Sequence, residues 1–338
     1  MSASTMEDTI KAILAPGKGI LAADESFPSI AKRFETYKIP STEENRRAYR
    51  ELFFSTAGLG EHISGVILFD ETLRQKMSDG TPMPEALAKQ GVVPGIKVDM
   101  GAVDLANFKG EKITQGLDGL RQRLAEYVKL GARFTKWRAV IQIGEAIPTQ
   151  TCIDANAEAL AMFAALSQEA GLVPIVEPEV LMDGDHTIER CENAITATLE
   201  SVFSALFAHR VVLEQMLLKS GMVLSGKLSA VQADDRTVAD ATIQTFHRTV
   251  PSAVPGIVFL SGGQSDIEAT RRLNVIAARG PLPWKLTFSY GRALQAAALK
   301  IWSGSASNLA PAQAAFHLRA QCNGLAVQGK YSDACEKG

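Results

Sequence analysis

Charged side chains follow most of the short apolar runs in this sequence, often in pairs spaced two residues apart. Side chains of a strand alternate between its two faces, so the members of such a pair share one face. A charge on a buried face is costly unless it is paired or used, and the pattern therefore indicates a reactive site. The pairs are Lys97 with Asp99, Lys136 with Arg138, and Glu177 with Glu179.

Lys219 ends a strongly apolar run that finishes in Met216-Leu217-Leu218. We expect its amine to be partly desolvated and to have Lys136 as a neighbouring cation, and both conditions make a lysine a usable nucleophile. The reaction that this suits is attack on a ketone to form a Schiff base, whose iminium accepts electrons during carbon–carbon cleavage. The structural alternative is a lysine that only pairs with Glu177 or Glu179.

Carboxylates for proton transfer are also present. We expect Glu177 and Glu179 to lie beside Lys136, so that one can remove water from a carbinolamine while the other holds Lys136. Asp24, at the end of the first run, can accept the proton of a substrate hydroxyl. A single charge after a strand often only begins a solvated loop, but polar groups after nearly every run argue against that reading.

Two groups of residues are suited to binding anions. Ser261-Gly262-Gly263 offers backbone N–H groups before a capped helix, and Tyr290-Gly291-Arg292 adds a second glycine turn with a guanidinium. Alone, a glycine pair after a strand can be merely a tight turn. A separate group of basic and hydroxyl side chains comprises Lys32, Arg33, Lys97 and Arg138 with Ser26 and Ser29. Two anion sites on either side of one lysine imply a bisphosphate substrate.

The histidines give no local metal motif. None of the five has HxxxH or HxH spacing, and we expect no metal and no cofactor. His209, His247 and His317 fall within or at the ends of amphipathic helices, where a surface or core histidine is the simpler interpretation. A metal-dependent mechanism is therefore disfavoured.

Short apolar segments that could carry these residues alternate with longer helical segments. This alternation predicts a parallel sheet with helical crossovers, and eight such units favour a closed (β/α)₈ TIM barrel, with its active site at the C-terminal ends of the strands. The predicted strands are Gly19–Ala23, Gly65–Phe69, Gly95–Val98, Arg133–Trp137, Val173–Val176, Val212–Leu218, Gly256–Leu260 and Leu286–Ser289. The predicted helices are Thr42–Ser55, Glu85–Lys89, Leu117–Leu130, Gln150–Ala170, Thr187–Ala208, Thr237–Val250, Ser265–Ala278, Arg292–Trp302 and Pro311–Val327.

The 338 residues fit one TIM-barrel domain, with an N-terminal helical extension over about 1–16 and a loose polar tail over about 329–338. The net charge of -2 suggests neither nucleic acid nor a membrane surface as a partner. The four cysteines show no CxxC spacing, which favours a reduced, cytoplasmic protein. The N-terminus does not read as a signal peptide, and no stretch reaches the ~18 apolar residues of a membrane span.

Segments of the sequence, in order from about Ala15 to Tyr331, resemble class I fructose-1,6-bisphosphate aldolase. They are Gly19–Ser26, Gly65–Phe69, Gly95–Asp99, Lys136–Arg138, Val173–Glu179, Leu217–Lys219, Phe259–Ser265 and Leu286–Gln295. The resemblance implies a metal-free lyase of glycolysis and gluconeogenesis, typically a homotetramer.

The resemblance also implies roles for individual residues. Lys219 would form the Schiff base, Glu177 would be the acid and base of imine formation, and Asp24 would take the proton of the C4 hydroxyl. Lys97 and Lys136 would assist, with Glu179 behind them. The C1 phosphate would be bound by Ser261, Gly262, Gly291 and Arg292, and the other phosphate by Ser26, Ser29, Lys97 and Arg138.

The chain departs from the family pattern at three places. Phe27-Pro28 stands where Thr-Gly is common, which predicts a different hold on the second phosphate. Ser220-Gly221 stands where Pro-Asn is common, which predicts a looser loop after Lys219. The family's long tail with a terminal tyrosine has no counterpart, because Tyr331 lies too early, and this fits a short-tailed, bacterial-type member.

Other functions remain as alternatives. The nearest is a related lysine aldolase that prefers sedoheptulose 1,7-bisphosphate or fructose 1-phosphate. A different class of function is a non-catalytic binding scaffold on the same fold, although retention of the candidate catalytic residues argues against it.

Overall fold

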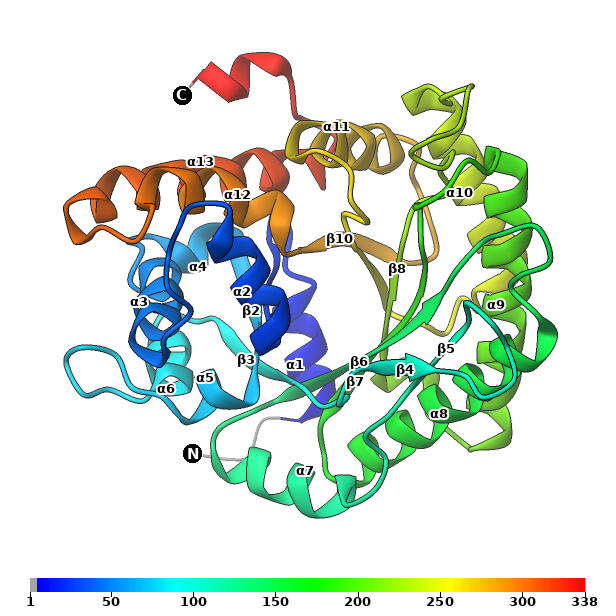
Figure 1. Ribbon diagram of the computed structural model, residues 1–338, viewed down its shortest axis with the longest axis horizontal. Helices are drawn as coiled ribbons and strands as arrows, with labels where there is room; N and C mark the ends of the chain where they lie inside the picture. Colours follow the sequence, from blue (N-terminus) through cyan, green and yellow to red (C-terminus); the bar gives the residue numbers. More distant parts are fainter. Residues whose placement is uncertain (1–4, 338) are drawn as a thin grey trace.

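The computed structural model describes residues 5–337, and within them eight parallel strands close into a barrel in the order β1-β10-β9-β8-β7-β6-β3-β2. Figure 1 shows the strands in the middle and the helices around them. The predicted TIM barrel is thereby confirmed. Its strands are β1 (Gly19–Ala23), β2 (Ile63–Leu68), β3 (Val93–Lys97), β6 (Phe134–Ile141), β7 (Val173–Val180), β8 (Leu217–Ser220), β9 (Gly256–Phe259) and β10 (Lys285–Tyr290).

Helices connect the strands, with additional helices between β1 and β2 and at both ends of the chain. The α-helices are α1 (Met6–Ile13), α2 (Phe27–Glu35), α3 (Glu43–Phe54), α4 (Leu59–His62), α5 (Asp70–Arg74), α6 (Met83–Lys89), α7 (Leu120–Lys129), α8 (Gln150–Glu169), α9 (Ile188–Ala208), α10 (Asp235–Thr249), α11 (Asp266–Ala277), α12 (Arg292–Trp302) and α13 (Leu309–Ala326). Short 3₁₀ turns are η1 (Leu213–Gln215), η2 (Ala306–Asn308) and η3 (Asp333–Lys337).

Several elements differ from the sequence prediction, which did not include helices α2, α4 and α5 and ended strands β6 and β7 four residues early. The predicted strand Val212–Leu218 is shorter, because η1 takes up its first half and β8 begins only at Leu217. An antiparallel hairpin, β4 (Ala102–Asp104) with β5 (Lys112–Thr114), was not predicted. The pattern Ser41-x-x-Glu44 predicts a cap at Ser41 for helix α3, but the cap is Thr42, whose side chain accepts from the Asn45 backbone N–H.

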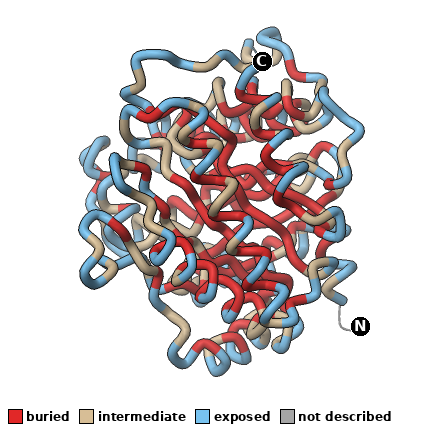
Figure 2. The backbone as a smooth tube through the Cα atoms, turned by 90° about the vertical axis from the view of Figure 1, so that its right-hand side faces the viewer, coloured by how far each residue is buried: buried red, intermediate tan, exposed pale blue. Residues whose placement is uncertain are grey.

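The barrel interior is packed, as Figure 2 shows by the buried chain at the centre. One apolar cluster inside the barrel includes Phe134, Ile175 and Leu217, and it also includes Ile13 from α1. Helix α1 therefore closes the N-terminal end of the barrel. A Cβ at Gly95 would lie 2.2 Å from the Phe134 ring, so this strand needs glycine to leave room for the aromatic side chain.

Charged residues form the next layer of the same interior. On each of three strands the residue two positions after the buried apolar side chain carries a charge, because alternate residues share a face. Lys136 follows Phe134, Glu177 follows Ile175, and Lys219 follows Leu217 in this way. The apolar layer thus forms the floor under a charged layer at the C-terminal ends of the strands.

The described part of the C-terminal tail is docked, so the expectation of a loose tail is wrong for it. Tyr331 is buried, and its hydroxyl donates to Glu336 at 2.8 Å. Glu336 also pairs with Arg319 of α13. These contacts hold residues 331–336 against α13, whereas residue 338 and residues 1–4 of the predicted extension lie outside the described residues.

Candidate active site

Lys136 on β6 is surrounded by three carboxylates. Its Nζ lies 2.6 Å from Asp24 Oδ2, 3.3 Å from Glu177 Oε2 and 3.9 Å from Asp99 Oδ2. The lysine side chain is 3% exposed. Three strands, β1, β6 and β7, and the segment after β3 therefore bring these groups to one point.

Lys219 on β8 shares one of those carboxylates. Its Nζ lies 2.9 Å from Glu177 Oε1, and its side chain is 5% exposed. Glu177 thus lies between two lysines, one at each oxygen. Glu177 Oε2 lies within ion-pair distance of Lys136 but forms no hydrogen bond with it. This oxygen can therefore accept a proton or a hydrogen bond from another group.

The electrostatics separate the roles of the two lysines. Burial by itself would lower the pKa of Lys136, but Asp24, Glu177 and Asp99 outweigh it and raise that pKa above its ordinary value. Lys136 is therefore a fixed cation at neutral pH and not a nucleophile. Burial by itself would raise the pKa of Asp24, but Lys136, Lys219 and Lys97 hold it well below its usual range. Asp24 is therefore a carboxylate, the form that accepts a proton.

A second ionic group continues from the first across β3, β6 and β7. Lys97 Nζ lies 2.6 Å from Asp99 Oδ1, and Asp99 Oδ2 accepts from the Arg138 backbone N–H at 3.2 Å. The guanidinium of Arg138 pairs with Glu179. Of the two glutamates expected beside Lys136, Glu177 therefore holds this lysine, and Glu179 pairs with Arg138 instead.

The segment after Asp24 begins helix α2. Ser26 is its N-cap, and the Ser26 and Ser29 hydroxyls lie 3.2 Å apart. Pro28 falls in the first turn, where helix N–H groups have no intrahelical partner, so its missing donor costs little. Among the described residues neither serine hydroxyl forms a hydrogen bond with Lys97 or Arg138, and Lys32 forms no ion pair.

Two cationic side chains, Lys227 and Arg292, lie beside the glycine turn after β9. Gly262 and Gly263 have φ of 56° and 92°, which favours glycine at both positions. A Cβ at Gly263 would lie 2.7 Å from Lys227 Nζ and 3.2 Å from Arg292 Nη2. Ser261 is buried beside them. Sequence reasoning missed Lys227, because a loop and not a strand end places it, and its only nearby signal is Asp183, with which it pairs at 2.9 Å.

Two further predicted residues, Gly291 and Arg33, lie together at the C-terminal end of the barrel. Gly291 lies close to the second basic group, since a Cβ there would be 3.7 Å from Arg33 Nη2. Arg33 pairs with Glu25, which Arg50 of α3 contacts at 2.7 Å. No sequence signal marks Arg50, because its helix precedes β2 and reaches the site only in the folded chain.

The loop after Lys219 is not loose, contrary to the expectation from Ser220-Gly221. Residues 221–226 are buried. The Val223 backbone N–H donates to the Thr242 hydroxyl at 2.9 Å, and the Leu224 backbone N–H donates to Cys191 Sγ at 3.4 Å. Side chains of α9 and α10 therefore fix the loop where the family pattern would use a proline.

Comparisons with known proteins identify the family of the chain. The family model described as fructose-bisphosphate aldolase class-I matches residues 5–338. A probable fructose-bisphosphate aldolase class 1 from Xanthomonas campestris is 57% identical over 98% of this chain and 99% of its own length. Cytosolic fructose-bisphosphate aldolase 5 from Arabidopsis thaliana is 53% identical over 96% of this chain and 90% of its own.

A solved structure is similar to this chain in both fold and sequence. It is fructose-bisphosphate aldolase from Plasmodium falciparum, in a complex with TRAP and a small-molecule inhibitor. Its TM-score is 0.95 at 50% identity, covering 97% of this chain and 95% of that one. Because the family model matches residues 5–338, nearly the whole chain, this chain belongs to the class I fructose-bisphosphate aldolase family.

Proposed function

We propose that this chain reversibly cleaves fructose 1,6-bisphosphate to dihydroxyacetone phosphate and glyceraldehyde 3-phosphate through a Schiff base on Lys219. The observation that supports this most strongly is the carboxylate of Glu177 between two buried lysines. One lysine, Lys136, is a fixed cation held by three carboxylates, and the other has only Glu177 as its ion-pair partner among the described residues. The geometry therefore favours Lys219 as the nucleophile.

Imine formation uses Glu177 as the proton carrier. The Lys219 ammonium first gives one proton to Glu177, 2.9 Å away, and the neutral amine then attacks C2 of the ketone. A second proton moves from the nitrogen to the carbinolamine oxygen. Glu177 then gives its proton to that hydroxyl, which leaves as water, and the nitrogen becomes positively charged as its lone pair forms the iminium.

Carbon–carbon cleavage uses Asp24 as the base. Asp24 takes the proton of the C4 hydroxyl, the C3–C4 bond breaks, and its electron pair moves into the iminium to form an enamine. Glyceraldehyde 3-phosphate leaves as the aldehyde. Lys136, 2.6 Å from Asp24, keeps this base ionised and stabilises charge nearby. Protonation of the enamine carbon and hydrolysis of the imine then release the second product and free Lys219.

The two phosphates are assigned to opposite sides of this centre. Ser261, Gly262, Gly291 and Arg292 would bind the C1 phosphate, and the Lys227 ammonium beside Gly263 adds a cation there. The other phosphate would be bound by Lys97, Arg138, Ser26 and Ser29. Arg138 is already paired with Glu179, so a phosphate would share this guanidinium with the carboxylate.

We further propose a cytoplasmic homotetramer. The Arabidopsis relative is named cytosolic. Among the described helices none is long and apolar enough to cross a bilayer. Phe207 and Leu228 are strongly exposed apolar side chains of the kind that subunit contacts cover. Sedimentation of the purified chain tests the assembly.

Cleavage kinetics with EDTA present test the activity and the substrate preference. The proposal expects kcat/KM to be highest for fructose 1,6-bisphosphate, compared with sedoheptulose 1,7-bisphosphate and fructose 1-phosphate. Lys219→Met should abolish cleavage, whereas the control Lys285→Met, at the exposed start of β10, should not. A higher kcat/KM for another sugar would identify the related aldolase, and binding without cleavage would favour the scaffold.

A further inference from the structure

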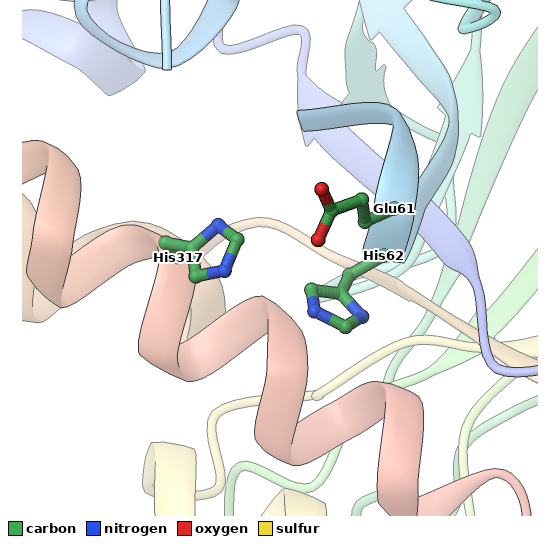
Figure 3. A group of neighbouring side chains, drawn as sticks. All are labelled: Glu61, His62 and His317. Atoms are coloured by element: carbon green, nitrogen blue, oxygen red, sulfur yellow. The ribbon is translucent and has the colours of Figure 1, made fainter. Parts of the chain in front are cut away.

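A group of potential metal ligands lies away from the catalytic residues, between α4 and α13. Glu61 and His62 end α4, and His317 lies in the middle of α13. One ligand atom from each of the three lies within 4.8 Å of the others. Figure 3 shows the carboxylate and the two rings around a common space between these two helices.

Two glycines let these groups come so close. Gly58 has φ of 74°, and a Cβ there would lie 3.1 Å from Glu61 Oε1 and 3.4 Å from His317 Cε1. A Cβ at Gly324 would lie 2.5 Å from the Gly17 carbonyl oxygen and 3.3 Å from His62 Nδ1. Side chains at either glycine would push the ligand groups apart.

The three side chains have no other assigned role. Among the described residues, the two rings and the Glu61 carboxylate form no hydrogen bond and no ion pair. The two rings contact each other edge to face, with centroids 5.2 Å apart. The nearby Lys18 ammonium opposes a cation, but it donates to the Gly60 carbonyl.

We propose that Glu61, His62 and His317 bind one divalent transition-metal ion of the Zn²⁺ class and thereby join α4 to α13. Two imidazoles and one carboxylate are ligands that Zn²⁺ accepts, and a water would fill the fourth tetrahedral position. Zn–N and Zn–O bonds of about 2.0–2.2 Å require the ligand atoms to approach by roughly an ångström. Side-chain rotation supplies that movement, since Glu61 is exposed and both rings are only half-buried.

The location assigns this ion a structural role. Helix α4 leads directly into the N-terminal end of β2, whereas the catalytic residues lie at the C-terminal ends of the strands. The length of β2, about 20 Å, separates the two. Local spacing could not indicate the site, because its ligands come from opposite ends of the sequence. The ion would tie the last long helix to the first half of the barrel.

Titration of the EDTA-treated full chain with Zn²⁺ by calorimetry, and with Co²⁺ by visible absorption, tests the proposal. We expect one ion per chain, a higher Tm with Zn²⁺, and a Co²⁺ spectrum without thiolate charge-transfer bands. His317→Ala and Glu61→Gln should each weaken binding by at least about tenfold and remove the Tm increase. The matched control is His209→Ala, which removes a surface histidine that also has a carboxylate neighbour, Glu158 at 2.8 Å.

Each outcome has a definite meaning. Binding that survives both ligand variants, or a Co²⁺ spectrum with thiolate bands, would place the ion elsewhere and overturn the proposal. Absence of saturable binding would overturn it as well. Glu61→Gln changes an exposed side chain and keeps its shape, so it should remain folded even if His317→Ala does not. Sugar cleavage is a separate readout that should stay unchanged in these variants.

Discussion

Lys136→Met should destabilise the protein in a pH-dependent way. Among the described residues Lys136 is the only ion-pair partner of buried Asp24, so the substitution leaves that carboxylate unpaired. Glu177 and Asp99 also lose a shared partner, although they keep Lys219 and Lys97. Breaking a buried ion pair by removing one partner typically costs about 3–5 kcal/mol. For a chain of 338 residues this corresponds to a decrease in Tm of roughly 4–7 °C.

The sign of the pH dependence follows from the two pKa shifts. In the native protein the pKa of Asp24 is depressed, so Asp24 stabilises the fold above its unfolded pKa of about 3.9, and this contribution is lost as pH falls through its folded pKa. The pKa of Lys136 is raised, so its contribution is present below its unfolded pKa, about 10.4, and is lost only as pH rises through its folded pKa. In the variant the crowded carboxylates take up protons at higher pH. The stability deficit should therefore be largest near pH 7 and shrink towards pH 4.

Urea unfolding of both proteins at pH 7, 5.5 and 4 measures this difference. Lys89→Met is the matched control, since Lys89 pairs with Glu85 on the exposed surface of α6, where solvent screens the pair and little stability should be lost. The reasoning would be refuted if Lys136→Met were as stable as this control at pH 7. A deficit that stays constant from pH 7 to pH 4 would also refute it.

Three further predictions concern other parts of the site and core. Glu177→Gln keeps the size of the side chain but removes the proton carrier, so single-turnover imine formation on Lys219 should slow by about 10²–10⁴-fold; an unaffected rate would remove Glu177 from this step. Gly263→Ala should raise KM for the bisphosphate and lower stability. The control Gly80→Ala has a similar positive φ but nothing within 4 Å of its Cβ, so it should lower stability by about 1 kcal/mol without changing KM. Equal KM values for the two variants would contradict the assignment of a phosphate to the turn at Gly263. Ellman's reagent at pH 8 should react quickly only with half-buried Cys335. Burial raises the pKa of the other three thiols, Cys152, Cys191 and Cys322, to about 11. Rapid reaction of a second thiol in the native protein would contradict this prediction.

The sequence predicts the barrel well because buried parallel strands and amphipathic helices have different patterns. It fails where that pattern is absent or misleading. The strands of the β4–β5 hairpin have three residues each, and β4 is wholly exposed, so no apolar run marks the hairpin. The apolar residues before β8 looked like a continuous strand, although Glu214 interrupts them within η1.

The catalytic candidates were predictable for a related reason. Alternation along a strand determines which residues share a face, so Lys136, Glu177 and Lys219 could all be assigned to the barrel interior. Alternation does not determine which partner a long side chain reaches, so it left open which of Glu177 and Glu179 pairs with Lys136. Lys227 could not be found from strand ends, because a loop brings it to the glycine turn after β9.

Reduction by borohydride in the presence of fructose 1,6-bisphosphate and EDTA, followed by peptide mass mapping, tests the central claim most directly. The account predicts a sugar-phosphate adduct on Lys219, with activity lost in proportion to labelling. Lys136, a fixed cation 2.6 Å from Asp24, should carry none. An adduct on Lys136, or cleavage that continues with no adduct on Lys219, would contradict the account.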